Sequence, residues 1–327
     1  KHDIEYLINT DIIKEPTFAD FEKILSAAIN FDADIIIGIG GGSVLDVAKL
    51  LAVQIDSKQP LKSIIGTGLI KGRNKYLICI PTTSGTGSEA SPNAILTDNE
   101  DMTKKGIISN FLIPDKVYID PELMIGLPPD ITAFTGIDAL THCIEAYTNK
   151  YSHPLVDNFA LEGIRLIVNN LPKAFINGSD IEARLNLAIG SFYGGLCLGP
   201  VNTAAVHALA YPLQSIFKIP HGIANSIMLP YVIEYNILSA PYRYACIYDA
   251  LEGFSSLKVN DKAKKFSEQI RVLLKNLKLP LSLNEVGIKK SYIESMAKSA
   301  YDVQRLLKNN IRDLSIEDIK IIYQKAF

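Results

Sequence analysis

The sequence is 327 residues long, which at about 150 residues per domain suggests two domains. Apolar residues make up 48% and charged residues 21%, which is typical of a globular protein and excludes collagen, coiled coil, disorder and disulfide scaffolds. The 33 basic and 35 acidic residues give a formal net charge of -2, so no nucleic-acid partner is expected. No run approaches the ~20 apolar residues of a membrane helix, so no membrane partner is expected either.

Strand and helix patterns alternate over the first ~125 residues. Strands are predicted at residues 4–8, 35–39, 76–80, 94–96 and 117–119, with helices from Thr17, capped with the help of Asp20, and over 43–53. The uninterrupted apolar run at 35–39 is typical of a strand covered on both faces. This alternation predicts an α/β fold with a parallel, doubly wound sheet.

From Pro128 onward the strand patterns disappear and helical periodicity takes over. Helices are predicted over 133–148, 155–170, 181–193, 203–211 and 261–277. Because two prolines interrupt the pattern at 128–129, we predict an α/β domain over 1–127 and an all-helical domain over 128–327. A ligand is expected in a crevice at the carboxyl ends of the strands, facing the helical domain.

The four cysteines are Cys79, Cys143, Cys197 and Cys246, and they lie far apart with no CxxC pair. This spacing argues against a disulfide framework and against a thiolate zinc site. We expect small buried apolar side chains at these positions and a reducing, cytoplasmic location.

A glycine-rich turn follows the predicted strand 35–39 and opens the next helix. It consists of Gly40, Gly41, Gly42 and Ser43, and Asp46 follows within the helix. Glycines at this place let the backbone approach a pyrophosphate, and the start of a helix favours negative charge. The alternative is a tight strand-to-helix turn without a ligand, since the spacing is not the usual GxGxxG.

A second turn, residues 81–89, follows the predicted strand 76–80 and is rich in hydroxyl groups. Thr82, Thr83, Ser84, Thr86 and Ser88 can hydrogen-bond phosphate, ribose or a nicotinamide amide. Such residues also form turns for purely local reasons. Two such turns, each at the end of a predicted strand, together favour a dinucleotide site.

Three histidines and one aspartate suggest a metal site in the helical half. Asp138 and His142 are four residues apart in a helical pattern, so both project from one face. His207 lies in another helical segment, and His221 follows Pro220 where a further helix is expected to begin. A mixed nitrogen and oxygen ligand set suits Fe(II) or Zn(II) better than Mg or Ca. The alternative is histidines that serve only the core or the helix ends.

The sequence resembles the iron-containing, group III alcohol dehydrogenase family over its whole length. The resemblance rests on Gly40–Ser43 with Asp46 and Lys49, on residues 81–89, on Asp138–Tyr147, on Ala205–Ala210, on Pro220–Gly222 and on the tail Asn309–Arg312. It implies a Rossmann-like domain followed by a helical domain, a divalent metal that is usually Fe(II), with Zn(II) as the alternative, and NAD or NADP as hydride carrier.

The resemblance also implies roles for individual residues. The implied metal ligands are Asp138, His142, His207 and His221. Implied cofactor contacts are Gly40, Gly41, Gly42, Ser43, Asp46, Thr82, Thr83, Thr86, Asn93 and Lys104, with Lys105 as the neighbouring alternative to Lys104.

The chain departs from the family pattern at two places. The family often has a histidine four residues after its third metal ligand, close to the nicotinamide, and here that residue is Tyr211. We predict that Tyr211 is catalytic and relays a proton, although a phenol with a pKa of ~10 is a poorer relay at neutral pH than an imidazole. The family also begins with a strand and helix that precede this sequence. Without that strand-helix unit, the sheet is expected to lack its first strand and dinucleotide binding to be weak.

The resemblance indicates an alcohol dehydrogenase that transfers hydride between NAD(P) and a small alcohol, aldehyde or ketone, and that works as a homodimer. Two alternatives remain open. One is a homologue that binds cofactor or metal but has lost catalysis. The other is a lyase similar to dehydroquinate synthase, a family that typically has a glutamate where Asp138 stands and one histidine fewer.

Overall fold

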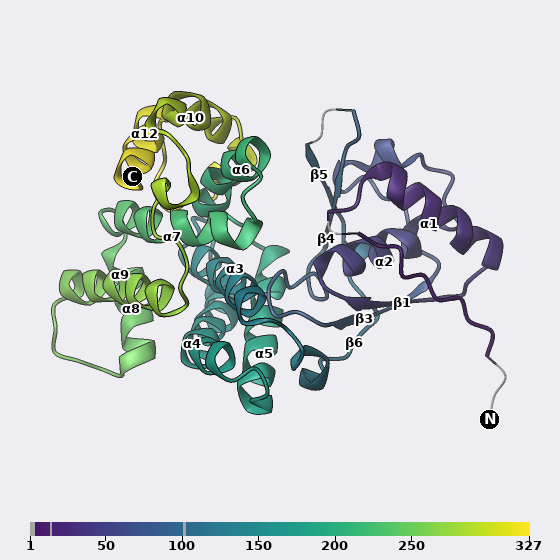
Figure 1. Cartoon of the computed structure of the whole chain (residues 1–327), viewed down its shortest axis with the longest axis horizontal. Helices are drawn as coiled ribbons and strands as arrows, with labels where there is room; N and C mark the ends of the chain where they lie inside the picture. The colour runs from purple at the N-terminus through teal and green to yellow at the C-terminus, as the bar shows by residue number, and fades with distance from the viewer. Residues whose placement is uncertain (1–3, 14, 101–102) are drawn as a thin grey trace. The chain divides into compact units, whose positions relative to one another are not determined.

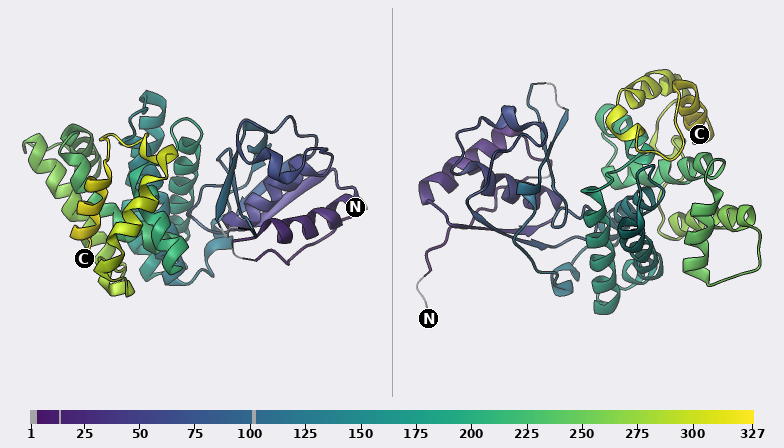
Figure 2. Two further views of the ribbon diagram at one scale, coloured as in Figure 1. Left: turned by 90° about the horizontal axis from the view of Figure 1, so that it is seen from above. Right: turned by 180° about the vertical axis from the view of Figure 1, so that it is seen from behind.

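The computed structural model describes residues 4–13, 15–100 and 103–327 (Figure 1). They form two compact units, the first comprising residues up to 82 together with 88–120, and the second comprising residues 83–87 together with 121–327. Strands occur only in the N-terminal part of the described chain, and the C-terminal part is built of helices (Figure 2). The predicted fold class, a parallel sheet domain followed by a helical domain, is confirmed.

The first unit alternates strands and helices as predicted. Its elements are α1 (Phe18–Phe31), β1 (Ile35–Gly40), α2 (Gly42–Gln54), η1 (Leu61–Ile64), β2 (Gly66–Thr67), β3 (Tyr76–Pro81), β4 (Asn93–Thr97), β5 (Lys104–Ile108), η2 (Asn110–Leu112) and β6 (Lys116–Val117). Thr17 caps α1, and the side chain of Asp20 accepts from the backbone of Thr17 in return, which is the predicted capping box.

The strands of the first unit belong to two small sheets. Strands β1, β3 and β6 pair in parallel in the order β1-β3-β6. Strand β5 pairs in parallel with β2 and antiparallel with β4, so β4 belongs to a second, mixed sheet. Apolar residues of α1, α2, β1 and β3 form the core of this unit, with Phe21, Leu50 and Leu77 fully buried.

Two expectations for the first unit are wrong. The run 35–39 is not covered on both faces: its side chains alternate between buried and exposed, and Ile35, Ile37 and Ile39 are each more than half exposed. The reason is that α2 packs against only one face of β1, and the side chains of Ile35, Ile37 and Ile39 point to the other face. No strand forms at residues 4–8, because this segment has no ladder partner among the described residues.

The second unit is a helical assembly around one large core. Its elements are η3 (Pro121–Met124), α3 (Pro129–Tyr147), α4 (Pro154–Ile176), α5 (Ile181–Leu198), α6 (Ala205–Phe217), α7 (His221–Ile237), α8 (Pro241–Glu252), α9 (Val259–Asn276), η4 (Asn284–Val286), η5 (Lys290–Tyr292), α10 (Ile293–Tyr301), α11 (Gln304–Leu307) and α12 (Ile316–Lys325). The helices predicted within α3, α4, α5, α6 and α9 are confirmed, and the helix expected at His221 begins there.

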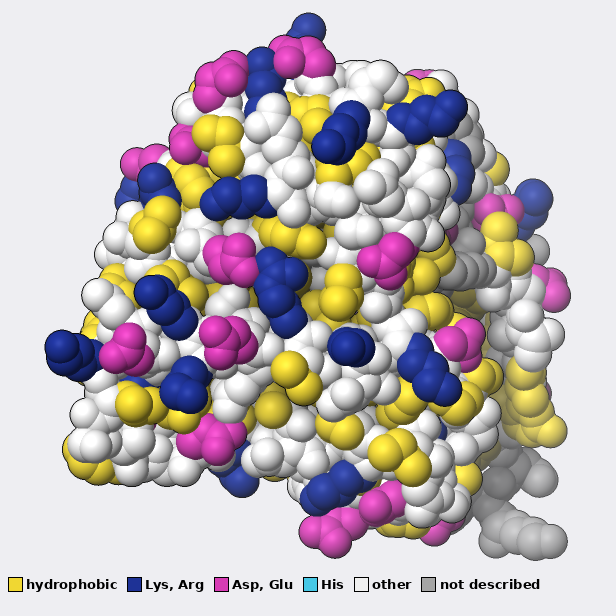
Figure 3. Space-filling view, turned by 60° about the vertical axis from the view of Figure 1, so that its left-hand side comes forward, with side chains coloured by type: hydrophobic (Ala, Val, Ile, Leu, Met, Phe, Trp, Pro, Cys, Tyr) yellow, Lys and Arg dark blue, Asp and Glu magenta, His cyan; other side chains and the backbone are white. Residues whose placement is uncertain are grey.

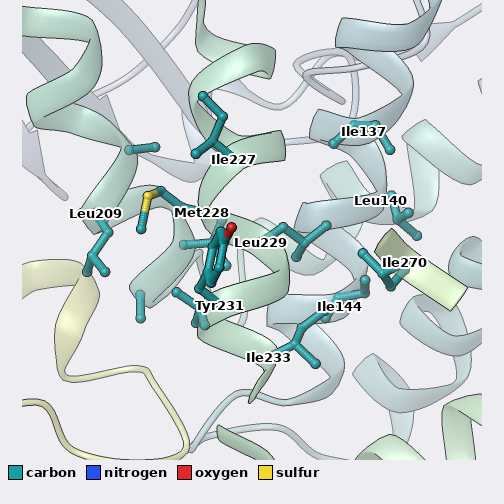
Figure 4. Packing of buried hydrophobic residues seen from close by; sticks show 14 of the residues in the cluster. Ile137, Leu140, Ile144, Leu209, Ile227, Met228, Leu229, Tyr231, Ile233 and Ile270 are labelled. Carbon is teal, nitrogen blue, oxygen red and sulfur yellow. The ribbon is translucent and has the colours of Figure 1, made fainter. Parts of the chain in front are cut away.

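The core of the second unit forms where α3, α6, α7 and α9 meet. The side of α3 that carries Ile137, Leu140 and Ile144 faces residues of α7 such as Ile227 (Figure 4). Ile270 of α9 belongs to the same cluster. Burial of this much apolar side chain is the main stabilisation of the unit. This core also fixes the first turns of α6 and α7 relative to α3, which is where the candidate metal ligands lie.

Two further sequence expectations concern cysteines and surface charge. All four cysteines are free, and Cys79, Cys143 and Cys197 are buried as expected, whereas Cys246 is only half-buried. On the face drawn in Figure 3, basic and acidic side chains are interspersed rather than gathered into a patch of one sign. Among the helices that the structure describes, none has the length and apolar character needed to cross a membrane.

Candidate metal and cofactor sites

Four side chains of the second unit converge from three helices. Asp138 and His142 lie one turn apart on α3, His207 lies in the first turn of α6, and His221 is the first residue of α7. The Nε2 atoms of His142, His207 and His221 lie 3.8, 3.5 and 3.2 Å from Oδ1 of Asp138. The structure therefore brings the four predicted ligands together around one carboxylate oxygen.

The spacing of these atoms fits a small metal ion. Tetrahedral ligands placed about 2.1 Å from one ion lie about 3.4 Å from one another, which is close to the 3.2, 3.5 and 3.8 Å between Oδ1 of Asp138 and the three imidazole nitrogens. Candidate ligand atoms of Asp138, His142 and His207 all lie within 4.8 Å of one another, and these three residues are buried. The rings of His142 and His207 stack with centroids 4.9 Å apart and planes 9° from parallel. A cluster of imidazole nitrogens this close to a carboxylate oxygen is typical of a site that binds a metal cation.

Two of the imidazoles are oriented by side chains behind them. Nδ1 of His207 lies 2.6 Å from Oε2 of Glu145, and Nδ1 of His221 lies 2.9 Å from Oε1 of Gln214. Because an ionised carboxylate only accepts hydrogen bonds, Nδ1 of His207 carries the donated proton. Nε2 is then the ring nitrogen that faces Asp138 and would bind a metal.

Glu145 also fixes the start of α6. Its Oε1 accepts from the backbone N–H of Val206 at 2.6 Å, and its Oε2 accepts from that of Ala204 at 2.9 Å. A carboxylate at a helix N-terminus satisfies donors that have no partner within the helix. The same side chain therefore places α6 and orients its histidine.

The charges of the cluster shift the pKa values of its members in different directions. Burial would raise the pKa of Asp138, but the neighbouring His221 and His142 outweigh it and hold this pKa well below its usual value. Burial lowers the pKa of His142 to about 4, against the attraction of Asp138. For His207, the carboxylates of Glu145 and Asp138 overcome burial and raise the pKa to about 9. The two buried carboxylates thus favour positive charge at this centre.

The first residues of the two predicted turns lie side by side in the first unit. Strands β1 and β3 are paired in parallel with Gly40 opposite Pro81, and the backbone N–H of Thr82 donates to the carbonyl of Gly40 at 3.0 Å. A Cβ atom at Gly40 would lie 2.6 Å from Cβ of Val44, so only glycine lets α2 begin this close to the strand. The N-cap residue of α2, Gly41, makes no side-chain cap, so the first N–H groups of the helix suit an anion.

The remaining predicted cofactor residues have different surroundings. The carboxylate of Asp46 accepts from Oγ of Ser88 at 2.5 Å and from the backbone N–H of Ile95 at 3.0 Å. Ser43 accepts from the backbone N–H of Glu15, and Lys104 forms an ion pair with Glu15 at 2.9 Å. Buried Oδ1 of Asn93 has no hydrogen-bond partner among the described residues, which leaves an acceptor for a ligand.

Thr83 and Thr86 belong to the segment 83–87, which packs as part of the second unit. Gly87 has a φ of 59°, and a Cβ atom there would lie 2.5 Å from Cα of Gly195 in α5. Both the backbone conformation and the close approach require glycine. The cofactor roles of the residues in both turns stay predictions.

Lys49, a buried lysine of the first unit, belongs to the motif that begins with the glycine turn, but the sequence predicts no role for it. Nζ of Lys49 is fully buried and donates to Ser88 through its carbonyl at 2.8 Å and its Oγ at 3.0 Å, and to Oγ of Ser91 at 3.4 Å. It also donates to the carbonyl of Asn93 and lies 3.8 Å from the carboxylate of Asp46. Lys49 therefore connects α2 to the end of the hydroxyl-rich turn and to the segment that follows it.

The carboxyl group of Glu89, next to this lysine in the same unit, makes stability depend on pH. Burial raises its pKa to about 7, against the lowering effects of its own backbone N–H and of Lys49. The neutral acid is favoured in the folded protein, so the stabilisation is fully present below the ordinary pKa of 4.5 and is lost as the pH rises through about 7.

We therefore expect Glu89→Gln to have nearly the wild-type free energy of unfolding at pH 4.5 and to exceed it by about 3 kcal/mol at pH 8. Glutamine stays neutral at every pH, so it avoids the cost of ionising a buried acid. Urea unfolding at the two pH values measures the difference. The exposed Glu22→Gln is the control and is expected to show no pH-dependent difference. The same offset for Glu89→Gln at both pH values would contradict this account.

Sequence reasoning missed the supporting residues of both sites. Glu145 lies three residues after His142, and Lys49 lies three residues after Asp46. Each spacing places the supporting side chain on the same helix face as a predicted site residue. Polar residues at this spacing from a candidate ligand, within otherwise apolar helices, were the available signal.

The sequence matches two family descriptions that together span almost the whole chain. Residues 1–121 match "Iron-containing alcohol dehydrogenase", and residues 132–327 match "Fe-containing alcohol dehydrogenase family, C-terminal". Long-chain-alcohol dehydrogenase 1 of Geobacillus thermodenitrificans is 40% identical over 324 residues, covering 98% of this chain and 82% of that protein. The 1,3-propanediol dehydrogenase of Klebsiella pneumoniae is 34% identical over 295 residues, covering 90% of this chain and 76% of the relative.

Solved structures share the fold over nearly the full chain. A crystal structure of 1,3-propanediol oxidoreductase superposes with a TM-score of 0.93 at 32% identity, covering 97% of this chain and 83% of the other. The alcohol dehydrogenase from Oenococcus oeni gives a TM-score of 0.94 at 29% identity, covering 99% and 85%. With the family's motifs present in order from the glycine turn to the last histidine, the chain belongs to the iron-containing alcohol dehydrogenase family, whose chemistry is hydride transfer between NAD(P) and alcohols or aldehydes.

Proposed function

We propose that this chain is an Fe(II)-dependent alcohol dehydrogenase that moves a hydride between NAD(P) and a small alcohol, aldehyde or ketone. Asp138, His142, His207 and His221 would hold the metal. The observation that carries the proposal is the convergence of three imidazole nitrogens on one buried carboxylate oxygen. When bound there, a divalent metal supplies a Lewis acid that favours an alkoxide over an alcohol or polarises a carbonyl group.

The donor set supports Fe(II) with Zn(II) as the alternative. Three imidazoles and one carboxylate suit either ion and disfavour Mg and Ca, which prefer oxygen ligands. Glu145 and Gln214 keep Nε2 of His207 and His221 directed inward, so these ligands need little rearrangement. Family membership supports iron as the metal in use.

The first unit supplies the proposed dinucleotide site. The glycine turn Gly40–Ser43 would bind the pyrophosphate at the start of α2, and Thr82 beside it would add a hydroxyl donor. Within this unit, Asn93 would offer its unpaired Oδ1, and Lys104 would add a further contact. The protein's part in hydride transfer is to hold the two reacting carbons close and to exclude water.

Tyr211 is the proposed proton relay. It lies one turn after His207 on α6, and burial raises the pKa of its phenol above the usual value, with Arg305 acting in the opposite direction. At neutral pH the phenol therefore stays protonated and can donate, or pass a proton on, but it is a weak base.

We expect Tyr211→Phe to lower kcat by about 10- to 100-fold and to leave the bound metal stoichiometric, because the phenol moves a proton without holding the metal. Steady-state kinetics with metal analysis of the same sample measure both quantities. Tyr323→Phe is the control, since its hydroxyl donates to the carbonyl of Leu209 on the same helix α6. Wild-type kinetics in Tyr211→Phe would remove the relay role.

Three further proposals concern the substrate range, the cellular compartment and the oligomeric state. Relatives are named for long-chain alcohols and for 1,3-propanediol, so a substrate panel has to span chain length and include diols. Four free cysteines support work in a reducing compartment such as the cytoplasm. We also propose a homodimer, which sedimentation analysis tests directly.

The deciding experiment is an aldehyde and alcohol screen on anaerobically purified, iron-loaded protein with NADH and NADPH supplied separately. We expect nucleotide oxidation that depends on both the aldehyde and the metal. A Zn(II)-loaded sample tests the choice of metal. Metal-loaded protein that binds a dinucleotide but reduces no carbonyl compound would favour the catalytically impaired alternative.

A further inference from the structure

Asn225 lies one turn after His221 on α7 and is completely buried. Its Nδ2 atom lies 2.8 Å from Oδ1 of Asp138 and 3.3 Å from Nε2 of both His207 and His221. One amide nitrogen therefore contacts three of the four atoms that form the proposed metal centre. Neither the sequence motif nor the proposed function gives this side chain a role.

The hydrogen-bonding character of Asn225 matches that of its neighbours. A primary amide offers two N–H donors, whereas the carboxylate of Asp138 only accepts. Nδ1 of His207 faces Glu145 and Nδ1 of His221 faces Gln214, so Nε2 is the atom of each ring that lies beside Asn225. The opposite amide orientation would place Oδ1 of Asn225 against the carboxylate, which is repulsive.

An ordinary buried asparagine satisfies both ends of its amide, and Asn225 does not. On the same helix, Asn236 donates to Asn310 at 3.0 Å and accepts from it at 2.8 Å. Oδ1 of Asn225, in contrast, has no hydrogen-bond partner within the part of the chain that is described. Leaving a buried acceptor unsatisfied costs about 1–3 kcal/mol, so packing alone does not account for an amide here.

The packing of α7 on α3 places Asn225 firmly. A Cβ atom at Gly222 would lie 2.2 Å from the carbonyl oxygen of Phe134, so the first turn of α7 rests directly on the backbone of α3. Asp138 is one turn further along α3. Because the two backbones are fixed this closely, the Asn225 amide and the Asp138 carboxylate have little freedom to separate.

We propose that Asn225 is a positioning residue of the metal centre, an inference that rests on the proposed metal-dependent function. Its N–H group holds Oδ1 of Asp138 at the point where the imidazole nitrogens converge. Glu145 and Gln214 orient two histidines from behind, and Asn225 does the same for the only carboxylate ligand. Residues that orient metal ligands typically change metal affinity by 10- to 100-fold when they are removed.

The test measures Co(II) affinity of the full chain by competition with a chelator, together with the visible Co(II) spectrum. Asn225→Ala removes the donor and leaves a cavity, whereas Asn225→Leu removes the donor and keeps the volume. Both are expected to bind Co(II) about 10- to 100-fold more weakly, with altered d–d bands. Asn236→Ala and Asn236→Leu are the matched controls on the same helix, and are expected to keep wild-type affinity and spectrum while lowering thermal stability.

Two outcomes overturn the inference. Wild-type Co(II) affinity in either Asn225 variant that folds, as judged by circular dichroism, shows that the amide does not position a ligand. A loss of affinity in the Asn236 controls as large as in the Asn225 variants shows that general loosening of α7 is the cause. Failure of the proposed function looks different, because wild-type protein then fails to bind Co(II) at this centre and Asp138→Ala leaves its metal content unchanged.

Discussion

Asp138→Ala is expected to bring the metal content from one equivalent per chain to near zero and to lower turnover by at least about 10³-fold. The carboxylate is the shared neighbour of His142, His207 and His221, so its loss removes one ligand and the charge that attracts a cation. Losing several kcal/mol of charge stabilisation at the reacting oxygen corresponds to a rate loss of this size. His207→Ala is expected to have the same effect, because it removes a ligand from a different helix.

The fold of the Asp138→Ala variant is expected to persist. The helical unit is held by an apolar core that extends far beyond this centre, so far-UV circular dichroism should match the wild type. Asp130→Ala, an exposed position on the same helix, is the control and is expected to keep metal and activity. Elemental analysis and NADH-linked assays of the same preparations measure the outcome. Stoichiometric metal in folded Asp138→Ala would remove Asp138 from the ligand set.

A residue of the proposed metal centre could be predicted from the sequence only where its partner lies close to it along the chain. Asp138 and His142 share one helix, so their spacing alone places them on one face. The contact between Asn225 and Asp138 joins positions 87 residues apart and depends on how α7 packs on α3, which no spacing reveals. The same holds for Glu145, which lies 62 residues before His207 in sequence.

The fold shows the same difference between local and long-range information. The apolar run at β1 and the glycines that follow it predict a strand-to-helix turn, and the structure has one. The run does not reveal that α2 covers only one face of β1, so the exposure of Ile37 was not expected. Similarly, β4 was predicted as a strand, but its antiparallel pairing with β5 depends on a strand that the sequence did not reveal.

Lys49→Met is expected to have the second largest effect, a loss of about 3–5 kcal/mol in the stability of the first unit. The ammonium group is fully buried and donates to three residues, Ser88, Ser91 and Asn93. Methionine has a similar length and fills the space, but it removes the hydrogen bonds that the ammonium group donates to these residues. It also leaves the carboxylate of Asp46 without the only cation that the structure places near it among the described residues.

The pKa of Lys49 is lowered because burial disfavours the charged ammonium group, although the neighbouring Asp46 acts in the opposite direction. A charge held this way stabilises the protein only as long as both partners are present, because removing one leaves the other uncompensated in a low-dielectric site. The loss is therefore much larger than that of a surface ion pair, which contributes about 0–1 kcal/mol.

The expected consequence for function is weaker dinucleotide binding, by at least about tenfold, because Lys49 holds the segment from Ser88 to the predicted cofactor contact Asn93. Urea unfolding and a calorimetric NADH titration measure the two effects. Lys75→Met is the matched control, since Lys75 belongs to the same unit and its side chain is only 10% exposed, but its partners Asp32 and Asp56 are far more accessible. It is expected to change stability by less than about 1 kcal/mol and to leave NADH affinity unchanged. Equal losses in the two variants would show that Lys49 acts no differently from Lys75, whose carboxylate partners are accessible to solvent.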